Sequence, residues 1–317
     1  MSPLPVVPAD PTNAVAEDPR AAALGQMLFF DEDLASEPGI SCSTCHSGPA
    51  MDDAGKHVSR GVKVGTRNSP PVINAVFYER QNWGGKFPTQ WALTMGALEK
   101  HDVMAAKREN VVEVVKTQYR AEYEALFGPI DARSIDDAYA DIAKTVAAYM
   151  RLLVARDAPF DRWIAGDEAA ISDQAKRGAK LFVAHCKSCH DGPHFTDNKF
   201  HALAAAQFGK GVPDEDLGRF GDVPEAERTP EMRGQFRTPT LRNVAVTAPY
   251  MHAGQFKTLD AVMAFYNAGG GSVEGIVKSP EMKKLGLTLE QQKDLVAFME
   301  TLTDTAVSPA LRANTSR

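Results

Sequence analysis

The chain has 317 residues, of which 44% are hydrophobic and 24% charged, and its formal net charge is −6. This length and composition suit a globular protein that we expect to form two domains. No basic run suggests binding to nucleic acid or to an anionic membrane, and no stretch reaches the length of a membrane helix.

The first twenty residues are rich in proline and small side chains, which predicts an extended arm. Residues 1–10 contain neither the basic segment nor the apolar segment of a signal peptide. The sequence then predicts a short helix at residues 21–30, which ends before an acidic turn at residues 31–33.

Two copies of the pattern C-x-x-C-H follow, Cys42-Ser43-Thr44-Cys45-His46 and Cys186-Lys187-Ser188-Cys189-His190. In c-type haem proteins the two thiols form thioethers with the haem, and the histidine binds its iron. A thioredoxin-like dithiol and a four-cysteine zinc site are the alternatives. Zinc does not require a histidine after each pair, and the gap between the pairs is far longer than in a zinc ribbon. These four cysteines are the only ones in the chain, so the sequence predicts two covalent haems.

The remaining pattern predicts helices and long loops, with few strand signals. Helices are expected at residues 111–127, 134–156, 172–185, 258–266 and 288–302, and loops at residues 48–86 and 197–237. Residues 160–166 read as a linker. We therefore predict a mainly α fold with an arm at residues 1–20 and two cytochrome-c-like domains at residues 21–160 and 161–317. Each domain would carry one haem and long ordered loops.

Further motifs resemble the bacterial dihaem cytochrome c peroxidase and MauG superfamily. In the first half these are residues 65–70 (GTRNSP), Asn74 and residues 83–86 (WGGK); in the second half they are residues 237–244 (RTPTLRNV) and 247–254 (TAPYMHAG). The resemblance covers residues 21–302. It implies a predominantly helical protein with one haem per domain and a calcium ion between the domains.

The resemblance also implies the sixth ligand of the second haem. The family places a methionine fourteen residues after the histidine that here is His252, and that count reaches Tyr266, which is the pattern of the MauG-like branch. A phenolate is an anionic donor that stabilises ferric and higher-valent iron, whereas methionine raises the reduction potential. Met263 and Met251 lie nearby and keep a thioether ligand open as an alternative.

The first haem lacks the loop histidine that ligates it in the peroxidases. The family spacings reach Val62 and Arg60, and His57, the one histidine in this loop, reads as a solvated residue. We expect iron held by His46 alone, with its other face open to hydrogen peroxide.

The peroxidases also use a glutamine and a glutamate to move protons, at positions that here are Leu93 and Val103. Neither side chain transfers a proton. Gln90, Glu99, His101 and Asp102 lie nearby, and we expect His101 and Asp102 to be the best candidates for an acid–base role. The alternative is that both lie on the exposed face of a helix start.

By resemblance, Trp83 corresponds to the tryptophan that relays electrons between the haems, although a buried core tryptophan would look the same. Asn68, Thr247 and Pro249 match positions that supply oxygen atoms to calcium, which accepts carbonyl and amide ligands.

We therefore expect a MauG-like enzyme that uses hydrogen peroxide at the first haem to oxidise a protein partner through the second. The first alternative is a peroxidase that receives its electrons from a small cytochrome c or cupredoxin. The second is a dihaem electron carrier without enzymatic activity. Because c-type haem is attached outside the cytoplasmic membrane, we expect a periplasmic protein whose leader is not part of this sequence.

Overall fold

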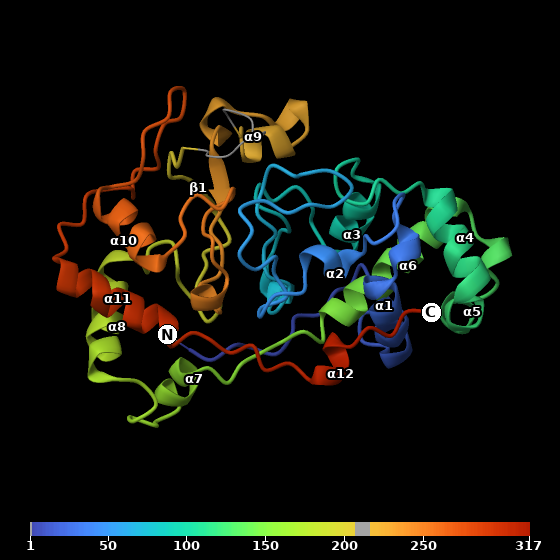
Figure 1. The fold of residues 1–317 in the computed structure, drawn as a ribbon, viewed down its shortest axis with the longest axis horizontal. Helices are drawn as coiled ribbons and strands as arrows, with labels where there is room; N and C mark the ends of the chain where they lie inside the picture. Colours follow the sequence, from blue (N-terminus) through green and yellow to red (C-terminus); the bar gives the residue numbers. More distant parts are fainter. Residues whose placement is uncertain (1, 207–215) are drawn as a thin grey trace.

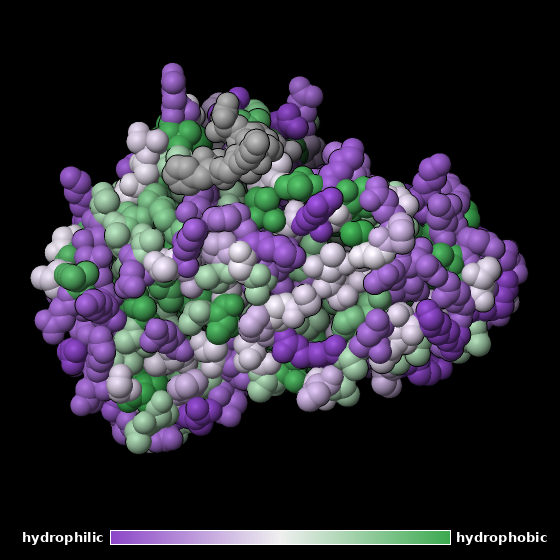
Figure 2. Space-filling model, in the orientation of Figure 1, coloured by the Kyte–Doolittle hydropathy of each residue, from purple (hydrophilic) through white to green (hydrophobic). Residues whose placement is uncertain are grey.

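The computed structural model describes residues 2–206 and 216–317. Figure 1 shows two helical units side by side, with their long loops facing each other at the centre of the molecule. The prediction of a mainly helical protein with two cytochrome-c-like regions is confirmed. On the face shown in Figure 2, hydrophilic side chains gather at the two outer ends, and hydrophobic side chains form small separate patches.

The first unit is built around one hydrophobic core that includes Leu28, Phe29, Tyr139, Ile142 and Tyr149. Its helices are α1 (Pro19–Phe30), α2 (Cys42–Cys45), α3 (Gln90–Glu99), α4 (Arg108–Gln118), α5 (Arg120–Phe127) and α6 (Ile135–Met150). Helix α6 begins where the Ser134 side chain accepts a hydrogen bond from the Asp137 amide, as a capping residue should.

The prediction of one continuous helix over residues 111–127 is wrong. The helix is broken at Tyr119, whose backbone leaves the helical conformation between α4 and α5. The Tyr119 side chain is fully buried, and its hydroxyl donates a 2.7 Å hydrogen bond to Asp31. Helix periodicity does not reveal such a break, because both halves keep an apolar face.

The second unit has its own core, in which Phe160, Phe182, Phe195 and Phe298 pack together. Its elements are α7 (Pro159–Ile164), α8 (Asp173–His185), α9 (Arg219–Asp222), α10 (Leu259–Asn267), α11 (Leu289–Glu300) and the short strands β1 (Phe200–Ala202) and β2 (Gln235–Arg237). The two strands pair antiparallel, with Phe200 opposite Arg237.

Each unit contains one close helix crossing that requires glycine. A Cβ atom on Gly25 of α1 would lie 1.9 Å from the carbonyl oxygen of Thr145 in α6. A Cβ atom on Gly178 of α8 would likewise lie 1.9 Å from the carbonyl oxygen of Asp294 in α11. Any side chain at these two positions would therefore separate the helices on which each core is built.

The two units repeat the same local structures at a constant spacing. Asn74 and Asn243 both adopt a left-handed conformation with φ of 65°. Two small antiparallel bridges, Gln81 with Phe87 and Tyr250 with Phe256, follow them. Threonine caps then begin α3 and α10, at positions 89 and 258. Because positions 74 and 243, 81 and 250, and 89 and 258 are each 169 apart, α3 and α10 occupy equivalent places in the two units.

The C-terminal segment returns to the first unit. Helix α12 (Pro309–Arg312) follows the second unit in sequence, yet Leu311 packs against the first core. The Arg312 side chain donates hydrogen bonds of 2.7 Å to the carbonyl oxygens of Gly48 and Pro49, just after the first C-x-x-C-H motif. Figure 1 shows this red segment running alongside the blue N-terminal arm.

Candidate functional site

Each C-x-x-C-H motif lines a cavity of its own. Cys42, Cys45 and His46 line the first cavity, which lies within the first unit and is closed in part by loops of the second. Cys186, Cys189 and His190 line the second cavity. Since the two cysteine pairs face different cavities, they do not form one four-cysteine zinc site.

Both motif histidines are prepared to bind iron in the same way. The Nδ1 atom of His46 lies 3.1 Å from the carbonyl oxygen of Met51, and Nδ1 of His190 lies 3.0 Å from that of Phe195. A carbonyl only accepts, so Nδ1 carries the proton and Nε2 keeps a free lone pair. Burial lowers the pKa of both histidines, although these carbonyls oppose it. The neutral imidazole is the form that binds a metal.

The first cysteine of each motif is half-buried and has a raised pKa. Burial raises the pKa of Cys42 and of Cys186 to about 12. Thioredoxin-like dithiols instead depend on a lowered thiol pKa. These raised pKa values therefore favour thioether attachment of haem over a redox-active dithiol.

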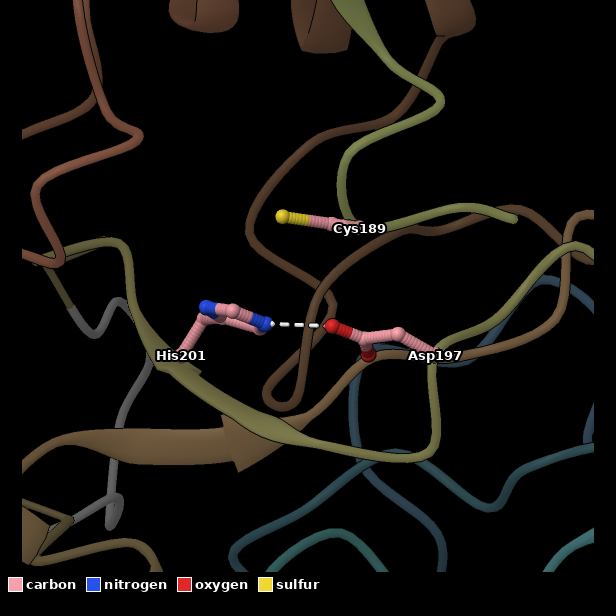
Figure 3. Close-up of side chains that lie close together, drawn as sticks. All are labelled: Cys189, Asp197 and His201. Atoms are coloured by element: carbon pink, nitrogen blue, oxygen red, sulfur yellow. Dashed lines mark hydrogen bonds and ion pairs between the residues drawn. The ribbon is translucent and has the colours of Figure 1, made fainter.

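One cluster in the described residues has the make-up of a metal site. Figure 3 shows the Nε2 atom of His201 bonded to Asp197 at 2.8 Å, with the Cys189 sulfur close to both. In the unmodified chain the sulfur of Cys189, followed by Asp197, raises the pKa of His201 to about 9. A thioether sulfur at Cys189 cannot ionise, so we assign the cluster to the haem surroundings and not to a separate metal site.

Tyr266 projects from α10 into the second cavity, which the alternatives Met263 and Met251 also line. The Tyr266 hydroxyl makes no hydrogen bond to any residue that the structure describes, and burial raises the pKa of its phenol. Sequence reasoning missed Met282 and Met299, which line the same cavity but have no counterpart in the family motifs.

The position of the first unit that corresponds to Tyr266 is occupied by Ala97. The spacing of 169 that relates α3 to α10 also relates these two residues, and Ala97 lines the first cavity. A methyl group offers no ligand atom. Met104 and Met150 also line this cavity, but both are packed into the first hydrophobic core.

His57 lines neither cavity. Its Nδ1 atom donates to the carbonyl oxygen of Gly254 at 2.5 Å, so it joins loops of the two units. This position is consistent with our prediction that His57 is not a haem ligand. His57 is, however, held by a hydrogen bond and is not a freely solvated residue.

Two buried polar atoms of residues at the first cavity, Oδ1 of Asp102 and Nε2 of Gln90, have no hydrogen-bond partner in residues 2–206 or 216–317. Leu93 and Val103 line the same cavity. His101 lines it too but is exposed. His101 and Asp102 follow the end of α3 and do not begin a helix. Unpaired buried polar atoms are costly, so they point to a missing ligand or water in this cavity.

Trp83 lies in the partition between the cavities. Its ring lines the second cavity, and its Nε1 atom donates a 2.8 Å hydrogen bond to the carbonyl oxygen of Asn68. Asn68, together with Pro70 and Tyr78, lines both cavities. Trp83 therefore lies beside residues that both cavities share.

The three candidate calcium residues come together from both units. Asn68, Thr247 and Pro249 all line the second cavity, and the backbone N–H of Asn68 donates to the carbonyl oxygen of His252 at 2.7 Å. None of these three residues has a carboxylate side chain. Carbonyl oxygens and water would therefore supply the calcium ligands.

Arg67 connects the two units through two carboxylates. Its Nε and Nη2 atoms contact the Asp216 carboxylate at 2.6 and 2.7 Å, and Nη1 contacts Asp222 at 2.6 Å. All three residues line the first cavity. Burial acts to raise the pKa of Asp216, but the Arg67 hydrogen bonds and charge outweigh it and lower that pKa.

We expect Arg67→Gln to destabilise the protein by roughly 2 kcal/mol near neutral pH, because hydrogen bonds between charged groups are lost. A carboxyl whose pKa is lowered by folding stabilises the protein above its unfolded pKa, and this contribution disappears as the pH falls through the folded pKa. Urea unfolding at pH 7 and at pH 3 should therefore show a difference between wild type and variant that shrinks in acid.

Arg108→Gln is the matched control, since Arg108 also bridges two carboxylates, Glu99 and Asp136, but on the surface. Surface pairs contribute little. Equal destabilisation by the two substitutions would show that the half-buried position of Arg67 has no special effect.

In the part of the chain that the structure describes, every helix is too short or too polar to cross a membrane.

Comparisons with known proteins match two families, one in each half of the chain. The family described as di-haem cytochrome c peroxidase matches residues 19–169, and the cytochrome c family matches residues 175–303. The chain is 37% identical to cytochrome-c peroxidase IdrP1 of Denitromonas iodatirespirans, over 96% of this chain and 86% of that protein. It is 36% identical to the methylamine utilization protein MauG of Methylorubrum extorquens, over 90% and 78%. A solved MauG-like protein associated with microbial copper homeostasis superposes with a TM-score of 0.82 at 27% identity, covering 99% and 96% of the two chains.

Proposed function

Because this chain belongs to the di-haem cytochrome c peroxidase and MauG family, a family of haem oxidoreductases, we propose that it is a MauG-like enzyme. It would use hydrogen peroxide at the haem of the first cavity to oxidise a protein partner through the haem of the second. A five-coordinate haem offers iron that can react with peroxide, and a six-coordinate haem transfers electrons. In this proposal His46 holds the first iron, and His190 and Tyr266 hold the second.

The observation that carries the proposal is the difference between two equivalent positions. Tyr266 offers a ligand atom in the second cavity, and Ala97 offers none in the first. The two sites arise from the same local structure but differ in the side chain at this position. One iron would therefore be closed and the other open.

Trp83 and the calcium residues support communication between the sites. The Trp83 indole lies in the partition, hydrogen-bonded to the backbone of Asn68. We propose that Trp83 relays electrons, and that calcium bound by Asn68, Thr247 and Pro249 fixes this partition. A calcium ion there would hold loops of both units in one arrangement.

For proton transfer we favour Asp102 over His101, since one oxygen of the Asp102 carboxylate is buried and has no hydrogen-bond partner in the described part of the chain. We expect Asp102→Asn to slow the reaction with peroxide by about 10²-fold or more, within the usual range for general acids and bases. His101→Gln should have a much smaller effect because that ring is exposed. Stopped-flow rates as a function of peroxide concentration measure both. A larger effect of the His101 substitution would reverse this assignment.

A peroxidase that draws electrons from a small cytochrome c or cupredoxin is the second candidate. The observation in its favour is Met263, which is 4% exposed and lines the second cavity one turn before Tyr266. A thioether ligand would raise the potential of the second haem and suit an electron-accepting site. Sustained oxidation of a reduced small cytochrome c by peroxide would favour this candidate.

Cyanide titration of the fully ferric protein tests the proposal. The optical spectrum should show binding of one cyanide per chain, since one iron is open. A chain that binds none would be a dihaem electron carrier and would refute the proposal.

We also propose that this protein acts in the periplasm, because c-type haem is attached outside the cytoplasmic membrane.

A further inference from the structure

We propose that Arg237 binds a propionate carboxylate of the second haem, on a wall that the two haem cavities share. This inference rests on the haem binding described above. It assigns a role to a residue of the RTPTLRNV motif that neither the haem ligands nor the peroxide reaction requires.

The fold holds Arg237 firmly in place. It is the last residue of β2 and lies opposite Phe200 of β1. Its backbone amide donates a 2.7 Å hydrogen bond to the carbonyl oxygen of Trp83. The residue is 3% exposed, and it lines both the first and the second cavity.

The charge of this guanidinium is not balanced within the described residues. Its Nε atom donates to Asn82 O at 3.3 Å and its Nη1 atom to Thr238 O at 3.4 Å, both long bonds to neutral carbonyls. It forms no ion pair with a carboxylate in residues 2–206 or 216–317. A buried charge is costly unless it is paired, so the site calls for an anion.

Arg242, five residues later, shows what a balanced site looks like in the same region. It is also 3% exposed, and its two terminal nitrogens each contact an oxygen of Asp161 at 2.8 Å. Arg237 lacks such a partner. Arg242 lines the second cavity only, whereas Arg237 lines both cavities.

Neighbouring groups do not replace the missing anion. The Tyr78 ring lies 3.3 Å from the Arg237 guanidinium carbon, a cation–π contact that offsets part of the charge. Asp216 lines both cavities, but its two carboxylate oxygens are engaged by Arg67. Thr238 lines the second cavity, and its buried hydroxyl has no hydrogen-bond partner among the residues that the structure describes.

Haem itself carries carboxylates that suit this site. The planar fork of arginine matches a carboxylate with two parallel hydrogen bonds, and the Thr238 hydroxyl offers another donor. Thr238 lines the second cavity and not the first, which assigns the propionate to the second haem. A positive charge on the shared wall would favour the ferrous state of both irons, and of the second iron more.

The test is a spectroelectrochemical titration of the holoprotein with Arg237→Gln. We expect the reduction potential of the His190 haem to fall, with a smaller fall for the His46 haem. Arg219→Gln is the matched control, because Arg219 also stacks on an aromatic ring, Phe200 at 4.0 Å, but lines neither cavity. Unchanged potentials in Arg237→Gln, or equal shifts in the control, would overturn the proposal.

Arg237→Lys keeps the charge and covers the case in which the glutamine variant does not fold. Resonance Raman spectra should show a shifted propionate bending band in the lysine variant, because the fork geometry is lost. An unshifted band would overturn the proposal. Haem content and cyanide binding, measured on the same samples, report separately on the proposed function, since neither depends on the propionate contact.

Discussion

Replacing Ala97 by methionine is expected to abolish the reaction of the ferric protein with hydrogen peroxide. Ala97 occupies in α3 the position that Tyr266 occupies in α10, and it lines the first cavity. A thioether at this position could reach the iron face that we propose to be open. Methionine is a common sixth ligand in c-type cytochromes, and a filled sixth position favours electron transfer over reaction with peroxide.

Stopped-flow mixing with peroxide measures this effect directly, and cyanide binding gives a second readout that should also be lost. Ala92→Met is the matched control, since Ala92 lies on the same helix but does not line the cavity. If Ala97→Met folds, carries both haems and still reacts at the wild-type rate, the iron face opposite His46 does not lie near Ala97.

Replacing Tyr266 by methionine is expected to raise the reduction potential of the second haem strongly. Phenolate is an anionic donor that stabilises ferric iron, whereas a thioether favours ferrous iron. Since axial ligands spread haem potentials over about 0.8 V, we expect a change of the order of hundreds of millivolts. A potentiometric titration followed in the visible spectrum resolves the two haems.

Tyr250→Phe is the control for this substitution, because Tyr250 also lines the second cavity and loses the same hydroxyl. Its second-haem potential should stay near that of wild type. A second haem whose potential is the same in wild type and in Tyr266→Met would show that Tyr266 is not the ligand. Met263, on the same helix, would then be the ligand to test, and the peroxidase reading would gain support.

Much of the haem-site chemistry could be predicted from the sequence, because it depends on residues that are close together along the chain. The two C-x-x-C-H motifs assign the cysteines and histidines without any knowledge of the fold. The helices that carry Ala97 and Tyr266 follow threonine caps. The correspondence between those two positions, however, depends on turns that no sequence periodicity marks, such as the left-handed Asn74 and Asn243.

Features that depend on distant contacts could not be predicted. The unbalanced charge of Arg237 becomes visible only when its surroundings are known, since the sequence around it contains no sign of which carboxylates lie near. The return of the C-terminal segment to the first unit through Arg312 and Leu311 is equally long-range. The preference for Asp102 over His101 likewise rests on burial, which two adjacent polar residues do not reveal.

The most direct measurement is a stopped-flow optical spectrum of the fully ferric protein mixed with one equivalent of hydrogen peroxide, without any reductant. Our proposal predicts a rapid change in the haem absorption bands that uses up the peroxide and that Ala97→Met lacks. A spectrum that stays unchanged would mean that the first iron is blocked or receives no proton, and it would contradict the MauG-like function.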